Sequence, residues 1–374
     1  MKRSKLFSVI LIAIMCVFLL TSCTPSEPPQ GDNADPSGTG GNGGKETKII
    51  SSSWLVPPPA LSSLDQRWLI DEIKECTNGR VTVEEFWSGA LVPAMEHLDA
   101  VSSGMADLAR LTFLYWPTDF PLNTMAYMFP FANTDPAMAV RVMREMYKEF
   151  PQFEEEMTKN NIKLIVLQVW DDYALLTRDK ITGIKDLKGK KVALLGGMLT
   201  EWAKTADIVP TSIPMDERYI QLKNGVIDGS LISVDSMVSF NQHEVAKYLT
   251  FFDLGAYVPN CLAMNLDTWN ALSAEDQENI LKAGEEIEIR YAEKMLEDRA
   301  GYIETMKEAG VEICDFPDAD RVKMAEKLPD LAAQWAKDVE KLGYPGWEMV
   351  KRYKELYEEQ GHEWISTLKI GEQE

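Results

Sequence analysis

Two rhythms of hydrophobic and polar residues follow one another along the chain, and they predict strands alternating with helices. Residues 80–87 (RVTVEEFW) alternate apolar and polar side chains, the period of a half-buried strand. Residues 62–79 (SSLDQRWLIDEIKECTNG) repeat apolar positions three and four apart and end at Asn-Gly, as an amphipathic helix does. Residues 106–112 and 162–170 are apolar runs that predict further strands. This succession is typical of a parallel α/β sheet.

The same rhythm returns in the second half of the chain. Residues 173–179 (YALLTRD) and 191–195 (KVALL) predict strands, and residues 198–206 (MLTEWAKTA) predict a helix. A helical stretch is expected from about 136 to 160, ahead of this repeat. The repetition predicts a second α/β domain.

A long charged helix is expected to begin after Ser273. Ser273 with Asp276 three positions later is a helix N-cap signal. The amphipathic pattern that follows predicts a helix running past Arg299, and residues 318–374 predict further helices.

The N-terminus has the pattern of an exported lipoprotein. A basic start (MKRSK) precedes an apolar run at 6–20 that is too short for a stable membrane span. The residues Leu20-Thr-Ser-Cys23 match the site at which bacterial lipoproteins are cleaved and lipidated on cysteine. Residues 1–23 are therefore predicted to be a signal peptide, with Cys23 as the membrane anchor. Residues 24–47, rich in Pro, Gly, Ser and Asn, are predicted to form a tether.

Charge and cysteine content narrow the possible partners. The chain has 59 acidic against 38 basic residues and a formal net charge of −21, so no nucleic-acid partner is expected. Beyond the signal peptide and Cys23, the cysteines are Cys76, Cys261 and Cys314. Their spacing fits no zinc site. They predict either one disulfide with a free thiol or buried unpaired thiols.

Signatures of catalysis, metal binding and cofactor binding are scarce. The three histidines, His97, His243 and His362, do not have metalloprotease spacing, and the chain has no Gly-x-Ser-x-Gly motif. Residues 185–197 (KDLKGKKVALLGG) place no lysine after their glycines, so they do not form a phosphate-binding loop. We expect no enzyme activity, no metal and no cofactor.

Tryptophans mark one edge of the predicted sheets. Trp54, Trp87, Trp116 and Trp170 each lie at the carboxyl end of a predicted strand or just beyond it. Open α/β sheets place their ligand crevice at that edge. Core packing explains any one of these residues equally well, but together they favour an aromatic-walled cleft.

A series of segments resembles one transport family. In order along the chain they read IDEIKECTNGRVTVEEFWSGAL, SSGMADLARL, FPF, GIKDLKGKKV, YIQLKNGVIDG, EVAKYLTF and LSAEDQENILKAG. This succession, which covers nearly all of residues 48–330, is similar to the extracytoplasmic solute receptors of tripartite ATP-independent (TRAP) transporters.

The resemblance implies a periplasmic-binding-protein-like α/β fold with two domains around a ligand cleft, bridged by a long helix. One domain is expected from 48–171 plus about 259–290. The other is expected from 172–258 plus about 291–374, with the C-terminal helices. It also implies a small organic ligand, closure on that ligand, and docking to the membrane subunits of a TRAP permease.

The resemblance also implies that the usual ligand-binding arginine is missing here. In the family, the stretch written DLKGKKVAL commonly carries an arginine at the position of Ala193, and that arginine pairs with a substrate carboxylate. A second arginine often lies where this chain has Tyr173, and the polar residue after the Asp-Gly turn corresponds to Ile232 or Ser233. These departures predict an aromatic, neutral or amine-bearing ligand.

Arg110 is the alternative cation. It lies within an apolar strand, where an unpaired guanidinium is unusual. It is expected either to bind a ligand carboxylate or to pair with a structural acid such as Asp171 or Asp172. Those two aspartates are expected, alternatively, to hold an ammonium group of the ligand, helped by the neighbouring aromatic walls.

The predicted ligand-binding residues are Trp54, Trp87, Arg110, Trp116, Trp170, Asp172, Tyr173, Ala193, Met215, Ile232 and Asp235. Three function classes follow. The first is a solute receptor, for either the altered ligand or a carboxylate clamped by Arg110. The second is a surface-tethered hydrolase or lyase with Asp171 or Asp172 as general base. The third is an adhesive lipoprotein.

Overall fold

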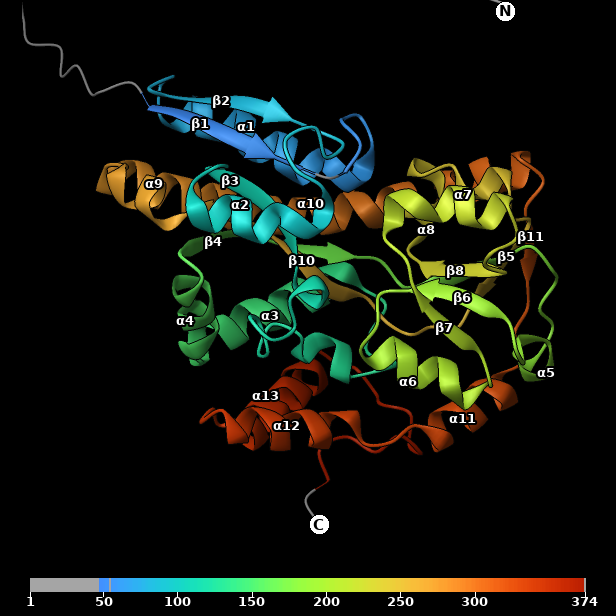
Figure 1. Ribbon diagram of the computed structural model, residues 1–374. Coiled ribbons are helices and arrows are strands. Elements are labelled where there is room, and N and C mark those ends of the chain that lie inside the picture. The colour runs from blue at the N-terminus through green and yellow to red at the C-terminus, as the bar shows by residue number, and fades with distance from the viewer. Residues whose placement is uncertain (1–46, 54, 373–374) are drawn as a thin grey trace, which may run out of the picture. The chain divides into compact units, whose positions relative to one another are not determined.

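The computed structural model describes residues 47–53 and 55–372, and their strands lie in two sheets (Figure 1). The first sheet has five strands in the order β2-β1-β3-β10-β4, and the second has six in the order β11-β9-β5-β8-β6-β7. The strands are β1 (Thr47–Ser52), β2 (Val81–Phe86), β3 (Leu108–Thr112), β4 (Ile162–Trp170), β5 (Ala174–Thr177), β6 (Lys191–Leu194), β7 (Val209–Ser212), β8 (Gly229–Ile232), β9 (Tyr248–Phe251), β10 (Tyr257–Asn265) and β11 (Glu312–Cys314).

Helices cover both sheets. The α-helices are α1 (Leu64–Cys76), α2 (His97–Ser103), α3 (Pro136–Glu149), α4 (Gln152–Lys159), α5 (Ile184–Leu187), α6 (Met198–Thr205), α7 (Arg218–Lys223), α8 (Val234–Ser239), α9 (Leu266–Ala271), α10 (Ala274–Glu308), α11 (Asp318–Lys327), α12 (Leu331–Lys341) and α13 (Gly346–Glu359). Short 3₁₀ helices are η1 (Leu61–Ser63), η2 (Ala94–Glu96), η3 (Phe113–Tyr115), η4 (Met125–Met128), η5 (Met215–Glu217) and η6 (Gln242–Glu244). β1 begins at Thr47, which the sequence had placed at the end of the tether.

The sheets are mixed, whereas the sequence predicted parallel ones. In the first sheet β10 runs antiparallel between β3 and β4, and in the second β5 runs antiparallel between β8 and β9. The chain leaves the first sheet at the end of β4 and returns to the same edge before β10. It therefore has to run back in the opposite direction. β10 was not predicted, although all of its residues are buried.

α10 accompanies both sheets, as the long-helix prediction required (Figure 1). The Ser273 hydroxyl accepts the backbone N–H of Asp276 at 3.1 Å, which confirms the predicted N-cap. The helix contacts β4, α1 and α3 on the first side and α8 on the second. At Gly284 it comes so close to β4 that a Cβ atom would collide with the carbonyl oxygen of Ile165.

Two other helical predictions change in detail. The stretch expected over 136–160 is two helices, α3 and α4, broken at Phe150-Pro151, because the residue before proline disfavours helical geometry. The C-terminal helices α12 and α13 contact η4 and α3, which neighbour the first sheet. The prediction had grouped all of 291–374 with the second domain.

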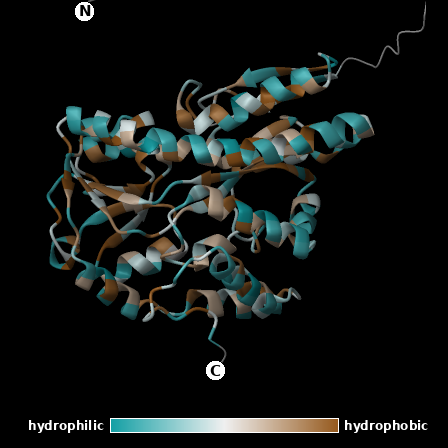
Figure 2. Cartoon of the chain, turned by 180° about the vertical axis from the view of Figure 1, so that it is seen from behind, coloured by the Kyte–Doolittle hydropathy of each residue, from teal (hydrophilic) through white to brown (hydrophobic). Residues whose placement is uncertain are grey.

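Hydrophobic residues concentrate on the strands, and the outward faces of the helices are polar (Figure 2). Within the described residues, none of the helices is both long enough and apolar enough to cross a membrane. Cys76, Cys261 and Cys314 are free thiols, so of the two alternatives the structure contains the unpaired one.

Candidate ligand site

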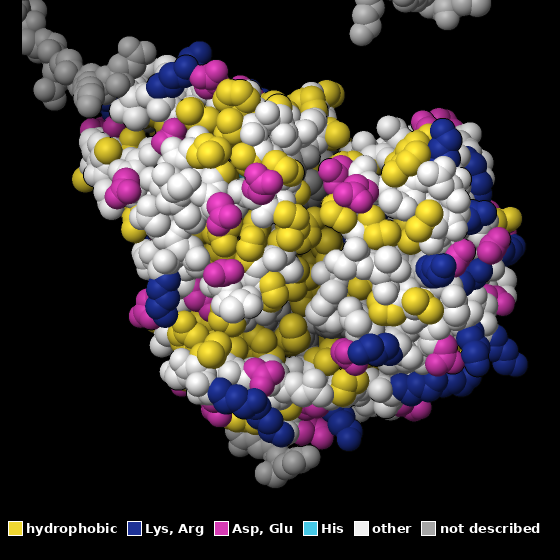
Figure 3. Space-filling view, in the orientation of Figure 1, with side chains coloured by type: hydrophobic (Ala, Val, Ile, Leu, Met, Phe, Trp, Pro, Cys, Tyr) yellow, Lys and Arg dark blue, Asp and Glu magenta, His cyan; other side chains and the backbone are white. Residues whose placement is uncertain are grey.

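A cavity of about 310 Å³ lies where the two sheets face each other. Its lining consists of Met95, Leu114, Tyr115, Pro117, Leu194, Leu195, Ser212, Ile213 and Pro214. Most of these residues follow β3 on one side and end or follow β6 and β7 on the other. This face of the molecule is hollowed between the part that carries α2 and the part that carries β6 and β7 (Figure 3). The cavity therefore occupies the carboxyl ends of parallel strands, where open α/β sheets bind ligands.

Arg218, the first residue of α7, is a fully buried cation beside this cavity. Its Nε donates to the carbonyl oxygen of Ile213 at 3.0 Å, and its Nη1 donates to the Ser230 hydroxyl at 3.1 Å and to the Leu231 carbonyl at 3.3 Å. In the described part of the chain, Nη2 has no hydrogen-bond partner and the guanidinium forms no ion pair. Burial lowers the pKa of Arg218 to about 10, so it stays charged at neutral pH.

The strand register connects Arg218 with the position of Ala193. Ala193 in β6 pairs with Ser230 in the parallel strand β8, so the two side chains lie on the same face of the sheet. Nη1 of Arg218 bonds the Ser230 hydroxyl, so the guanidinium reaches the face of the sheet that carries Ala193. Ala193 is itself fully buried.

Tyrosines surround the charge of Arg218. Tyr115, Tyr127 and Tyr173 all interact electrostatically with this guanidinium. The Tyr127 and Tyr173 hydroxyls share a hydrogen bond of 2.8 Å, and the Tyr127 ring stacks on Tyr257 at 5.1 Å. Burial raises the pKa of Tyr115 to about 12 and raises those of Tyr127 and Tyr173 further, so these phenols stay neutral. They supply dipoles and aromatic surface, but no counter-charge.

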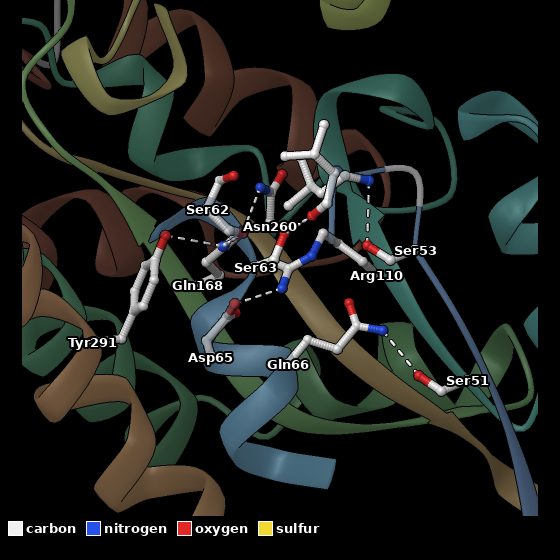
Figure 4. Close-up of polar contacts among 12 residues, drawn as sticks. Ser51, Ser53, Ser62, Ser63, Asp65, Gln66, Arg110, Gln168, Asn260 and Tyr291 are labelled. Carbon is white, nitrogen blue, oxygen red and sulfur yellow. Dashed lines mark hydrogen bonds and ion pairs between the residues drawn. The ribbon is translucent and has the colours of Figure 1, made fainter. Parts of the chain in front are cut away.

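Arg110 is paired, and its partner is Asp65. Nη2 of Arg110 donates to Asp65 Oδ1 at 2.6 Å, and both side chains are fully buried (Figure 4). The expectation that Arg110 pairs with a structural acid is confirmed, but the acid is Asp65 and not Asp171 or Asp172, because Asp65 at the start of α1 reaches β3 from the neighbouring layer. The charge of Arg110 is therefore offset within the protein.

A polar cluster surrounds this ion pair (Figure 4). Gln66 Nε2 donates to the Ser51 hydroxyl at 2.9 Å, and Asn260 Nδ2 donates to Gln168 Oε1 at 2.7 Å. Among the described residues, several buried atoms of the cluster have no hydrogen-bond partner: Ser62 Oγ, Asp65 Oδ2, Gln66 Oε1, Asn260 Oδ1, and Arg110 Nε and Nη1. Buried polar atoms are normally paired, so the cluster has capacity for a polar ligand group.

Asp171 and Asp172 lie on the segment that joins β4 to β5, and both pair with Arg299 of α10. The nearest N–O distances are 3.2 Å to Asp171 and 3.8 Å to Asp172. Asp172 Oδ1 also accepts the backbone N–H of Gly255, on the segment that leads into β10, at 3.0 Å. Burial raises the pKa of Asp171 to about 6 and that of Asp172 to about 8. These groups tie together the segments that connect the two sheets.

The described tryptophans among the predicted site residues have different neighbours. Trp54 lies outside the described residues. Trp87 donates to Glu85 at 3.0 Å and packs against the core around β1 and α1. Trp116 packs edge-on against Tyr115, with 5.9 Å between the ring centroids. The ring centroid of the buried Trp170 lies 6.2 Å from that of Tyr173. Aromatic residues do converge on the region between the sheets, but most of them are tyrosines.

The remaining predicted residues are buried on the second side of the molecule. The thioether of Met215 accepts an N–H from Gln242 at 3.2 Å, and Ile232 ends β8. Asp235 lies in the first turn of α8, and burial raises its pKa. Within the described chain its Oδ1 atom has no hydrogen-bond partner.

The sequence prediction missed Arg218, Tyr127 and Tyr257. A signal for Arg218 was present, because it lies four residues before Leu222 and therefore on the apolar face of its helix. An arginine on such a face is unusual and indicates a paired or functional charge.

Mixed α/β sheets that face each other across a lined cavity, joined by crossing segments and one long helix, define a periplasmic-binding-protein-like solute receptor. Residues 63–338 match the family described as DctP, bacterial extracellular solute-binding protein, family 7. The chain belongs to this family, and it is a receptor of the TRAP type.

Similar proteins have matching descriptions. A solute-binding protein of Chromohalobacter salexigens is 26% identical over 62% of this chain and 69% of its own length. The ectoine-binding periplasmic protein TeaA of Halomonas elongata is 24% identical over 74% of this chain and 81% of its own. A solved TRAP solute-binding protein from a marine metagenome, specific for aromatic acid ligands, superposes with a TM-score of 0.73. It is 23% identical and covers 85% of this chain and all of its own.

Proposed function

We propose that the protein captures a small organic acid between its two sheets and delivers it to the membrane subunits of a TRAP permease. The observation that carries this proposal is the buried guanidinium of Arg218, which has no counter-charge within the described residues. A buried, unpaired charge costs several kcal/mol. A carboxylate ligand would supply the missing partner through charge-assisted hydrogen bonds.

The cavity supports a ligand of modest size. Its volume of about 310 Å³ is near the lower end of the ~300–1,000 Å³ that small-molecule sites occupy. Its aliphatic side chains and Tyr115 would contact an apolar part of the ligand, while Ser212 and the other polar surface of the lining would contact a polar part. The specificity of the metagenome receptor for aromatic acids is consistent with such a ligand.

A thermal-shift screen tests the proposal. The mature protein is heated with small monocarboxylates, with their neutral primary amides, and with amines of similar size. We expect stabilisation by the acids alone, about 2.7 kcal/mol when a ligand is present at 100 times its Kd. Stabilisation by amides or amines without any by acids would contradict it.

An amine-bearing ligand is the second candidate, and the unbonded carboxylate oxygens of Asp65 and Asp235 favour it. The loss of the family arginine at Ala193 pointed to the same ligand class. The ectoine-binding relative shows that the family includes receptors for nitrogen-containing solutes. In the screen, this candidate predicts the largest shifts for amines.

Two further features complete the proposed role. Members of this family are solute receptors, and we propose that this chain has no enzyme activity. Asp171 and Asp172, the candidate general bases, both pair with Arg299. Conversion of a bound acid, detected by mass spectrometry, would contradict that view.

Extracytoplasmic anchoring through lipidated Cys23, which lies outside the described residues, is also proposed. The mass of the N-terminal peptide tests it.

A further inference from the structure

Arg218 and Ala193 share a neighbour in the second sheet. Ala193 is a small, fully buried residue of β6. Arg218 enters from α7 and bonds Ser230, the register partner of Ala193. An arginine at both positions would place two guanidinium groups on the same buried face, where like charges repel strongly.

Arg218 is not itself among the lining residues, but its contacts connect it to residues that line the cavity. Its Nε is fixed by the carbonyl oxygen of Ile213, which lines the cavity from the second sheet. Tyr115 lines the cavity from the opposite side. The charge of Arg218 lowers the pKa of Tyr115, although burial raises this pKa by more. With Nε and Nη1 bonded to the protein, Nη2 is left to bind a ligand.

The charges around the cavity set a limit on the ligand. Arg110 is neutralised by Asp65, and Arg299 is matched by Asp171 and Asp172. Arg218 is fully buried and forms no ion pair within the described residues. A second carboxylate on the ligand would therefore be buried without a cation of its own, at a large cost.

We infer that Arg218 is the specificity-determining cation of this receptor, that it takes the place of the arginine that the family resemblance implies at position 193, and that it selects monocarboxylates. The inference rests on the proposed function and narrows it. Position 193 has to stay small for Arg218 to reach the ligand. Dicarboxylates of similar size bind weakly for lack of a second free cation.

Variants at three positions test the assignment, by calorimetric titration with the best monocarboxylate from the screen. Arg218→Met is expected to weaken binding about 100-fold or more. Arg218→Lys keeps the charge but not the forked geometry, and about 10-fold weaker binding is expected. Arg144→Lys, at an ion pair with Glu288 away from this sheet, is the matched control, and Arg110→Lys, which preserves the pair with Asp65, tests the alternative clamp. Both variants are expected to bind within about threefold of the wild type.

A transplant separates recognition from a structural role. In the Arg218→Ala background, Ala193→Arg is expected to recover at least tenfold of the lost affinity, because the new guanidinium would occupy the same face of β6 and β8. Ala193→Arg alone is expected to abolish binding. Unfolding curves without ligand should show Arg218→Met at least as stable as the wild type, because it removes a buried unpaired charge, whereas a purely structural arginine would lose stability.

The outcomes are distinguishable. If the wild type binds a monocarboxylate and the affinity of Arg218→Met for it is within threefold, the assignment of Arg218 is overturned. The proposed function would still stand in that case. A loss confined to Arg110→Lys would move the clamp to Arg110. Equal affinity for matched mono- and dicarboxylates would overturn the charge limit. Failure of every acid to bind the wild type would instead remove the proposed function.

Discussion

Asp172 lies where the chain crosses from the first sheet to the second, and burial governs its charge. Its carboxyl group is fully buried, and burial raises its pKa to about 8 against the lowering effects of Gly255 and Arg299. In the unfolded chain an aspartate titrates near pH 3.9. Between these values the folded state binds more protons than the unfolded state. The free energy of unfolding therefore decreases as pH rises from about 4 to about 8.

Replacing this residue should remove much of that dependence. Asp172→Asn keeps the oxygen that accepts the Gly255 N–H but cannot ionise. One such group contributes a slope of about 1.4 kcal/mol per pH unit. Urea unfolding at pH 5 and pH 8 should show a smaller loss of stability for the variant, which should exceed the wild type in stability at pH 8. Equal slopes for the two proteins would contradict the raised pKa. Asp171, with its pKa raised to about 6, should preserve a weaker slope below pH 6.

For single residues, the sequence predicted which charged side chain is unusual, but it did not predict the partner of that side chain. The unusual position of Arg110 in an apolar strand was recognised, but its partner Asp65 is 45 positions away and is brought near only by the packing of α1 on the sheet. Arg218 carried a comparable signal within a short helix and was not identified. Periodicity shows that a charge is buried, whereas the fold decides what it meets.

At the scale of elements, the close approach of α10 to β4 depends on a missing side chain. Gly284 faces the backbone of Ile165, so a methyl group there would force the helix away from the strand. Gly301 lies in the same helix, is exposed, and has open space around the position of a Cβ atom. The two glycines are a matched pair in one helix.

Alanine at these positions should act in opposite directions. Gly284→Ala should destabilise the protein by about 1–3 kcal/mol through overpacking. Gly301→Ala should stabilise it by about 0.5–1 kcal/mol, because alanine loses less backbone entropy than glycine in a helix. Denaturant unfolding of both variants gives the comparison. A neutral or stabilising Gly284→Ala would show that α10 does not need this contact.

Local patterns predicted most elements of this fold, including β4, α1 and the capped start of α10. They did not predict β10, whose nine residues are buried on both faces and show no alternation. Nor did they predict the mixed direction of the strands, since pairing depends on where the chain re-enters each sheet. The helix break at Phe150-Pro151 was readable from the proline, but the predicted stretch passed over it.

At the scale of the whole molecule, two short segments connect the sheets, one at the expected boundary at 171–172 and one just before the expected boundary at about 258–259. β4 ends at Trp170 in the first sheet and β5 begins at Ala174 in the second, while β9 ends at Phe251 and β10 begins at Tyr257. We propose that the chain changes domain within these gaps. The hydrogen bond from Gly255 to Asp172 joins the two gaps, and Arg299 adds α10 to the same junction.

The family and the two-sheet architecture followed from the order of motifs along the chain, and the comparisons confirm both. The ligand class could not be deduced in the same way. The resemblance implied that Ala193 replaces an arginine of the family, which favoured an aromatic, neutral or amine-bearing ligand. In the structure Arg218 of α7 bonds Ser230, the register partner of Ala193.

A crystal structure of the protein with its best monocarboxylate bound tests the central claim most directly. The account predicts a carboxylate oxygen within about 3 Å of Arg218 Nη2, the length of a charge-assisted hydrogen bond. It also predicts that the apolar remainder of the ligand lies against Tyr115 and that the Arg110–Asp65 pair stays intact. A carboxylate bound at Arg110, with Arg218 out of contact with the ligand, would contradict it.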